Sequence, residues 1–302
     1  LHLPDCLLFI PETLIIYDNQ KSILFLTKTI DNSASNKKNV YENLVNEFKK
    51  IEKDIKINKG YDDINFNKRK KIIPKSNISR SKFEKNINLA KKYIKDGDIF
   101  QVVPSQRFYA KYDATGKKLY QVLRKTNPSP FLYYFNLPNF NIVGSSPEIL
   151  VRLRKNVITI RPIAGTRPRG KSKEKDKFYE RELLKDKKEV SEHLMLLDLG
   201  RNDVGRVSRK SSVKVTSSFT IEKYSHVMHI VSNVQGQIQQ GKTSMDALMA
   251  GFPAGTVTGA PKIRAMEIID ELENIKRGIY AGGIGYISPN GDMDTCIALR
   301  TG

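Results

Sequence analysis

The sequence is poor in cysteine, has no tryptophan, and has no run of about 18 apolar residues. Its two cysteines, Cys6 and Cys296, provide neither a disulfide framework nor a set of metal ligands, which predicts a reducing, cytoplasmic setting. Without a long apolar run, we expect no membrane-spanning helix. Residues 1–10 are apolar but lack the basic flank and the small-residue cleavage site of a secretory signal.

An initiator methionine is also missing, and the chain ends at Gly302 directly after a strand-like run. We therefore expect a fragment of a longer protein that lacks both ends.

The net charge of +20 has two interpretations. A basic surface can bind nucleic acid, or it can be a solvated, lysine-rich exterior. The lysines are dispersed and mixed with Asn and Ile, as in Lys37–Lys75, and no zinc, helix-turn-helix or aromatic RNA-binding pattern accompanies them. The pattern favours the solvated exterior and no nucleic-acid partner. A basic nucleic-acid-binding protein stays open as the alternative from another class.

Hydrophobic spacing divides the chain into residues 1–79 and residues 80–302. The first part predicts two strands within residues 4–30, a helix over Tyr41–Ile55 and a Lys- and Asn-rich exposed connection over Asn58–Ser79. The second part predicts strands at Ile99–Val103, Leu132–Asn136, Ile142–Val143, Ile149–Leu153, Val157–Ile160, Gly283–Ser288 and Met293–Arg300. It also predicts helices from an N-cap at Ser81, with Glu84 completing a capping box, to Lys95, over Asp176–Gly200, from Ala247 to Phe252, and from Pro261 to Leu272. Hairpins mixed with long helices indicate an α+β fold with antiparallel sheets.

Two segments are rich in Gly and Thr and suit an anion. Residues 161–170 place Gly165 and Thr166 between arginines, so backbone N–H groups, a hydroxyl and positive charge can meet a carboxylate or phosphate. Residues 255–262 form a Gly/Thr loop that leads into a helix N-terminus. A basic surface turn and a capped turn are the alternatives that composition leaves open.

Two other segments carry charged groups in unusual places. Glu189 and Glu192 lie three residues apart, so they share a helix face, where two carboxylates can hold a hard cation such as Mg²⁺. A solvated face is the alternative. In the last predicted strand, alternation places Arg300 on the face of Asp294 and Cys296, where it can clamp a carboxylate. A solvent-facing arginine is the alternative.

Five strings in one order resemble the chorismate-utilising enzymes. They are PIAGTRPRG, EHLMLLDLGRND, YSHVMHIVS, GTVTGAPKIRAME and GGIGYISPNGDMDTCIALR. The resemblance spans residues 80–302 and is weaker over the first 80. It implies antiparallel sheets that sandwich helices, with a chorismate-binding catalytic domain over residues 80–302, truncated at its C-terminal end, after the remainder of a regulatory region.

The resemblance also implies the roles of single residues. It gives Glu192 as a ligand of the cofactor Mg²⁺ and Glu189 as its neighbour. Contacts to chorismate fall to Gly165, Thr166, Tyr280 and Arg300. Catalytic roles fall to Glu148, as general acid for the departing C4 hydroxyl, and to His229 and Thr256, which line the ring. The remaining part of a site for L-tryptophan, the feedback inhibitor, falls to Pro130, Phe131 and Leu132. A second metal-binding glutamate and a Gly-Ala-Gly loop are expected beyond Gly302.

Two positions choose among family members. Those that add water to chorismate carry a lysine base where this chain has Gln101, which cannot deprotonate water. Those of one aminodeoxychorismate type carry a lysine nucleophile where this chain has Ala164. The resemblance therefore points to component I of the anthranilate synthases, in which ammonia from a glutamine amidotransferase subunit, component II, attacks C2. An aminodeoxychorismate synthase component I without that lysine is the alternative.

Overall fold

The computed structural model describes residues 3–30, 37–57 and 72–302. The chain divides into two units, Leu1–Arg69 and Lys70–Gly302. In the first unit, the two predicted strands are β1 (Thr13–Asp18) and β2 (Ile23–Lys28), which pair antiparallel, and helix α1 spans Lys37–Lys56. An ion pair of 2.8 Å between Lys28 Nζ and Glu47 Oε2 joins β2 to α1.

Part of the predicted connection, residues 58–71, lies outside the described residues. The predicted domain boundary at residue 79 stays a prediction. Among the residues that the structure describes, every helix is too short or too polar to cross a bilayer.

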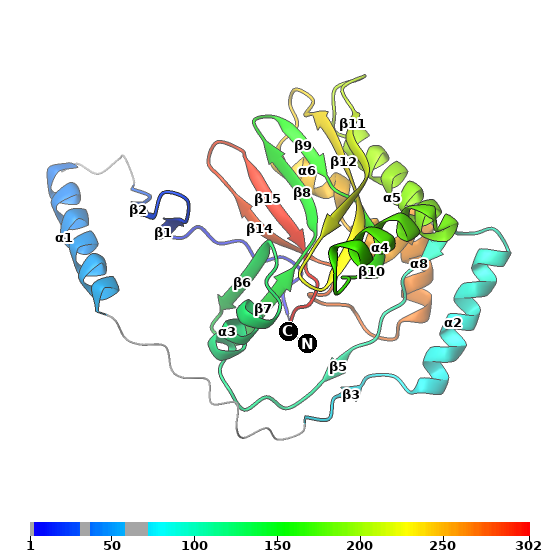
Figure 1. Cartoon of the computed structure of the whole chain (residues 1–302). Coiled ribbons are helices and arrows are strands. Elements are labelled where there is room, and N and C mark those ends of the chain that lie inside the picture. Colours follow the sequence, from blue (N-terminus) through cyan, green and yellow to red (C-terminus); the bar gives the residue numbers. More distant parts are fainter. Residues whose placement is uncertain (1–2, 31–36, 58–71) are drawn as a thin grey trace. The chain divides into compact units, whose positions relative to one another are not determined.

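The second unit is built on a seven-stranded antiparallel sheet in the order β10-β12-β9-β8-β15-β14, with β11 added against β12 (Figure 1). Its strands are β8 (Ile149–Arg154), β9 (Val157–Ile160), β10 (Ile163–Pro168), β11 (Lys214–Lys223), β12 (Val227–Gln237), β14 (Gly283–Ile287) and β15 (Met293–Ile297). Three short pairs accompany it: β3 (Lys75–Ser76) with β5 (Phe108–Tyr109), β4 (Gln101–Val102) with β13 (Gly259–Ala260), and β6 (Phe131–Asn136) with β7 (Asn141–Ser146).

The helices of this unit are α2 (Arg80–Lys95), α3 (Gly116–Thr126), α4 (Lys173–Lys185), α5 (Lys187–Gly205), α6 (Ser244–Gly251), α7 (Gly255–Thr258) and α8 (Lys262–Leu272). Helices α4, α5 and α6 pack on the large sheet (Figure 1). The main core lies at this contact, where Leu150 and Ile158 of the sheet meet Leu197 and Val204 of α5. Burial of these side chains removes apolar surface from water and holds the helices on the sheet. The predicted α+β class with antiparallel pairing is confirmed.

Several predicted boundaries were wrong for local reasons. The helix expected over Asp176–Gly200 is two helices, because Asp186 is extended and its carboxylate caps α5 by accepting from the N–H groups of Lys188 and Glu189.

Helix α2 has its N-cap at Ser79 rather than Ser81, and Glu84 pairs with Arg80 instead of closing a capping box. Pro261 is the N-cap of α8 rather than its first helical residue.

Candidate functional site

The Gly165–Thr166 segment forms a bulge on β10 that faces His229 on β12. Gly165 has a φ of +69°, and a Cβ there would come within 3.1 Å of Leu183 and 3.3 Å of Glu189 Oε2, so the position requires glycine. The register shifts between Ala164 and Thr166, which places Thr166 opposite His229. Two predicted substrate contacts and one predicted catalytic residue therefore come together.

The imidazole of His229 has a defined orientation. Its Nδ1 lies 2.9 Å from the carbonyl oxygen of Gly165 and 3.1 Å from Thr166 Oγ1. Because a carbonyl only accepts, Nδ1 carries the proton and Nε2 is an acceptor in the neutral ring. Burial lowers the pKa of His229, and the charge of Arg300 lowers it further against the opposing effect of the Gly165 carbonyl. The ring is therefore neutral near pH 7.

Glu189 and Glu192 project from one face of α5, as their spacing predicts. Gln101 on β4 donates a hydrogen bond from Nε2 to Glu192 Oε1 at 3.0 Å. Glu189 lies 3.9 Å from Arg167, which also pairs with Asp186 at 2.8 Å. Within the part of the chain that the structure describes, no three acidic, His or Cys side chains gather as a metal cluster. The hydrogen bond from Gln101 occupies Glu192 Oε1, and the second carboxylate oxygen of Glu192 is the one that could face a cation.

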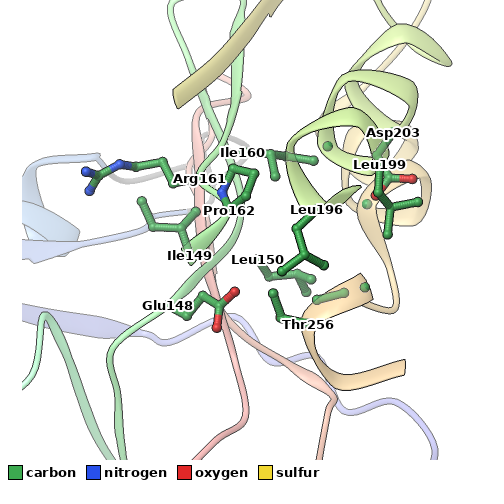
Figure 2. Close-up of a pocket in the computed structure, with 14 residues that line it drawn as sticks. Glu148, Ile149, Leu150, Ile160, Arg161, Pro162, Leu196, Leu199, Asp203 and Thr256 are labelled. Carbon is green, nitrogen blue, oxygen red and sulfur yellow. The ribbon is translucent and has the colours of Figure 1, made fainter. Parts of the chain in front are cut away.

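Glu148 and Thr256 line a small cavity of about 30 Å³ beneath β8 and α5 (Figure 2). Glu148 precedes β8 and is only 9% exposed. Burial raises the pKa of Glu148 to about 7, against a smaller lowering effect of the Thr256 hydroxyl. A carboxyl that keeps its proton near neutral pH can act as a general acid.

Arg300 does not lie on a strand, contrary to the prediction from alternation. Strand β15 ends at Ile297 after a register shift at Thr295, and Arg300 has a φ of +49°. Its Nη1 donates to Asn127 Oδ1 at 3.2 Å, and its charge acts on His229. Arg300 therefore reaches the same region as the Gly165–Thr166 bulge, but from the loop after β15.

Tyr280 and the Pro130–Leu132 segment are positioned by other contacts. The Tyr280 ring packs against the main core with the Arg277 guanidinium 5.4 Å from its centroid, and burial raises its pKa. Phe131 begins β6 and lies opposite Ser146, while Leu132 lies opposite Ser145. The backbone N–H of Ser145 donates to the carbonyl of Arg300, which connects the β6–β7 hairpin to the site.

Two basic residues, one buried and one partly buried, were not predicted from the sequence. Lys262 stood in a quoted motif without a role, yet its Nζ lies 2.7 Å from Asp203 Oδ2 with both side chains buried. Arg277 donates to the backbone carbonyls of Val257 and Val103, and so holds α7 beside β4. The helix-start position of Lys262 was visible in the sequence, but lysine at a helix start is ordinarily solvated, so nothing in the letters indicated its burial.

Buried titratable groups with shifted pKa values, such as Glu148 and His229, are frequent at the functional sites of enzymes. Residues 1–302 match the family of chorismate binding enzymes. The chain belongs to that family.

Curated relatives include component 1 of anthranilate synthase from Cereibacter sphaeroides, 60% identical over 227 residues that cover 75% of this chain and 45% of that protein. The same component from Acetivibrio thermocellus is 47% identical over 304 residues, 99% of this chain and 61% of that protein. The chain thus spans about half the length of these relatives.

Solved structures agree with the fold. Anthranilate synthase component I from Streptococcus pneumoniae superposes with a TM-score of 0.85 at 40% identity and covers 96% of this chain and 63% of that one. The menaquinone-specific isochorismate synthase from Escherichia coli shares the fold at a TM-score of 0.69 and 19% identity, covering 79% of this chain and 56% of that one.

Proposed function

We propose that this chain is the chorismate-converting part of an anthranilate synthase, which forms anthranilate and pyruvate from chorismate and ammonia in tryptophan biosynthesis. The observation that carries the proposal is the amide of Gln101 against Glu192, in a site whose other deciding position is Ala164. Neither side chain can deprotonate water or attack carbon. Ammonia needs neither a base nor a covalent intermediate, because it is itself the nucleophile. The names and identities of the relatives support the same reaction.

Chorismate is a ring diacid, and the site offers matching donors. Arg300 supplies positive charge, and Thr166 in the Gly165–Thr166 bulge supplies a hydroxyl next to neutral His229. Tyr280 is assigned a substrate contact by resemblance and lies beside Arg277. We infer that these groups hold the carboxylates and the ring of chorismate.

Glu148 is the group that we propose protonates the departing C4 hydroxyl. Its proton is retained to about pH 7 because the carboxyl is buried, and Thr256 is its polar neighbour. On donation, the C4–O bond breaks, the proton goes to the leaving oxygen and Glu148 becomes a carboxylate. That carboxylate must regain a proton before the next turnover.

The carboxylates of α5 fit Mg²⁺, which prefers oxygen ligands and keeps several waters. Glu192 would hold the ion through the oxygen that Gln101 leaves free, with Glu189 beside it. Bound Mg²⁺ would supply charge stabilisation for a substrate carboxylate. Two carboxylates and several water molecules would provide part of the set of oxygen ligands that Mg²⁺ requires.

Ammonia would come from a glutamine amidotransferase, component II, as the words "component 1" in the relatives' names suggest. Cys296 does not offer a nucleophile for that chemistry, because it is buried and burial raises its pKa to about 11. For feedback by L-tryptophan we propose Pro130, Phe131 and Leu132, whose hairpin is bonded to Arg300 through Ser145.

The test is the product of the full-length protein with chorismate, Mg²⁺ and ammonium, separated by chromatography. Anthranilate as the main product, with an equal amount of pyruvate, supports the proposal. Aminodeoxychorismate would favour the alternative component I, and isochorismate would contradict the argument from Gln101 and Ala164. Salt-sensitive retention on DNA without any conversion of chorismate would favour the nucleic-acid reading.

A further inference from the structure

The cavity beneath Glu148 combines apolar walls with polar groups that lack partners. Leu150, Ile160 and Leu196 form much of its wall, while Glu148, Thr256 and Asp203 also line it (Figure 2). Thr256 Oγ1 and Asp203 Oδ1 are buried and have no hydrogen-bond partner among the described residues. Two buried polar groups without a hydrogen-bond partner among the described residues therefore belong to side chains that line one pocket.

Asp203 belongs to a buried ion pair that ties three helices together. Its Oδ2 lies 2.7 Å from Lys262 Nζ, at the start of α8, and Lys262 also donates to the carbonyl of Gly251 at the end of α6 at 3.3 Å. Asp203 itself lies in the last turn of α5 and is 4% exposed. The pair uses Oδ2 and leaves Oδ1 without a hydrogen-bond partner among the described residues, in a side chain that lines the cavity.

A buried polar atom without a partner costs roughly 1–3 kcal/mol, and more for a charged group. Such atoms are therefore satisfied by protein or by ordered water in nearly all native structures. A buried water molecule needs a cavity volume of roughly 10–15 Å³ and several polar partners. The cavity, at about 30 Å³, offers both.

We propose that this cavity is a built water site in which ordered water donates to Asp203 Oδ1, completes the hydrogen bonding of Thr256, and thereby positions Thr256 against Glu148. In this proposal Asp203 is a positioning residue. It binds the water that orients Thr256 and makes no contact with the substrate itself. The role in turnover rests on the proposed function, whereas the presence of the water does not.

The charged surroundings of Glu148 are limited. Arg161 lines the same cavity and is paired with Glu222, Tyr224 lies close enough to feel the charge of Glu148, and Lys262 is paired with Asp203. Of these neighbours, the Thr256 hydroxyl is the one that lowers the pKa of Glu148, so a group that positions Thr256 acts on the proton affinity of Glu148.

The first experiment is a crystal structure of the full-length protein at a resolution that shows ordered water. Density for water within hydrogen-bond distance of Asp203 Oδ1 is the expected result, and a cavity without such density overturns the proposal. The presence of the water does not depend on the reaction. If the protein forms no anthranilate but the water is present, the proposed function is wrong and the water site stands.

The second experiment replaces the ion pair by apolar residues of similar size, Asp203→Leu with Lys262→Met, which often leaves stability unchanged. We expect loss of the ordered water, a fall in kcat of about tenfold and a displaced basic limb of the pH profile of kcat. Thr256→Val, which removes only a hydroxyl, should displace the same limb and serves if the double variant does not fold.

Thr258→Val is the matched control. Thr258 lies on the same short helix, and its hydroxyl is bonded to the carbonyl of Ala254 at 2.9 Å instead of lining the cavity. We expect it to leave the pH profile in place. If the double variant and Thr256→Val both keep the wild-type pH profile, the positioning role is wrong.

Discussion

The side-chain amide of Gln101 donates a hydrogen bond from Nε2 to Glu192 Oε1 at 3.0 Å. A carboxylate can only accept, so this contact fixes which end of the amide faces the helix. The other end, Oε1, is buried and has no partner among the described residues. The hydrogen bond from Gln101 thus orients Glu192, the candidate metal ligand. It also leaves the amide oxygen of Gln101, which can only accept a hydrogen bond, at the position where other members of the family carry a lysine base.

Gln101→Lys should change the choice of nucleophile in the full-length enzyme. A lysine there can pair with Glu192 and deprotonate a water near C2, so we expect part of the flux to go to isochorismate or salicylate. Ala164→Lys should instead place an amine that competes with ammonia. Products separated by chromatography check both variants. Anthranilate as the sole product of an active Gln101→Lys variant would refute the assignment.

Glu192→Gln should abolish Mg²⁺-dependent turnover and leave the fold intact, because an amide supplies neither the charge nor the ligand strength of a carboxylate. Its bond with Gln101 can persist, since a glutamine oxygen also accepts. Rates measured against Mg²⁺ concentration, with thermal unfolding as the check on folding, test this. Glu267→Gln, on the solvent side of α8 and paired with Arg264, is the control. An unchanged Mg²⁺ dependence would show that Glu192 is only a surface residue.

The sequence predicted those features of the site that depend on residues close together in the chain. The Glu189–Glu192 face follows from helical spacing alone, and the structure confirms that both lie on α5. The strand β12 and its partner β11 were not predicted, although Met228, Ile230 and Val234 of β12 alternate with polar residues in the pattern of a strand. The two strands form a hairpin whose register shifts at two bulges, and hydrophobic spacing alone does not give the position of a bulge.

Two errors have different origins. Asp186 interrupts what reads as one helix because its carboxylate caps α5, and Arg167 of β10 also pairs with that carboxylate at 2.8 Å. Arg300 was placed on a strand by alternation, but the register shifts at Thr295, β15 ends at Ile297, and Arg300 bonds Asn127 instead. The cap at Asp186 is a local signal that hydrophobic spacing does not include, whereas the partner of Arg300 is distant in sequence.

Ser232→Ala removes a single hydroxyl group, and we expect it to destabilise the protein strongly. Ser232 Oγ accepts from the backbone N–H of Phe219 at 3.1 Å and lies 2.6 Å from Nε2 of the buried His193. Losing both partners at once should lower the free energy of unfolding by about 2–4 kcal/mol. Urea unfolding checks this, with Ser191→Ala as control, since that exposed hydroxyl bonds only its own helix. Equal midpoints for the two variants would contradict the prediction.

Because of Glu148, the free energy of unfolding should fall as the pH rises. A carboxylate in an ion pair has the opposite effect, because its folded pKa is lowered. Burial raises its folded pKa to about 7, while the unfolded value is near 4.5. Between these values the folded state binds more protons than the unfolded state. The stabilisation is therefore complete below pH 4.5 and is lost as pH rises through about 7.

The difference in unfolding free energy between wild type and Glu148→Gln should accordingly shrink by up to about 3 kcal/mol from pH 4.5 to 8. Comparing the two proteins at each pH cancels the other titrating groups, among them His193, whose burial lowers its pKa to about 4. Urea unfolding over this range gives the difference directly. The same titration predicts that kcat declines above about pH 7, where the general acid is ionised. A difference that stays constant with pH would mean that Glu148 is ionised throughout, and it would remove the proton that the proposed step requires.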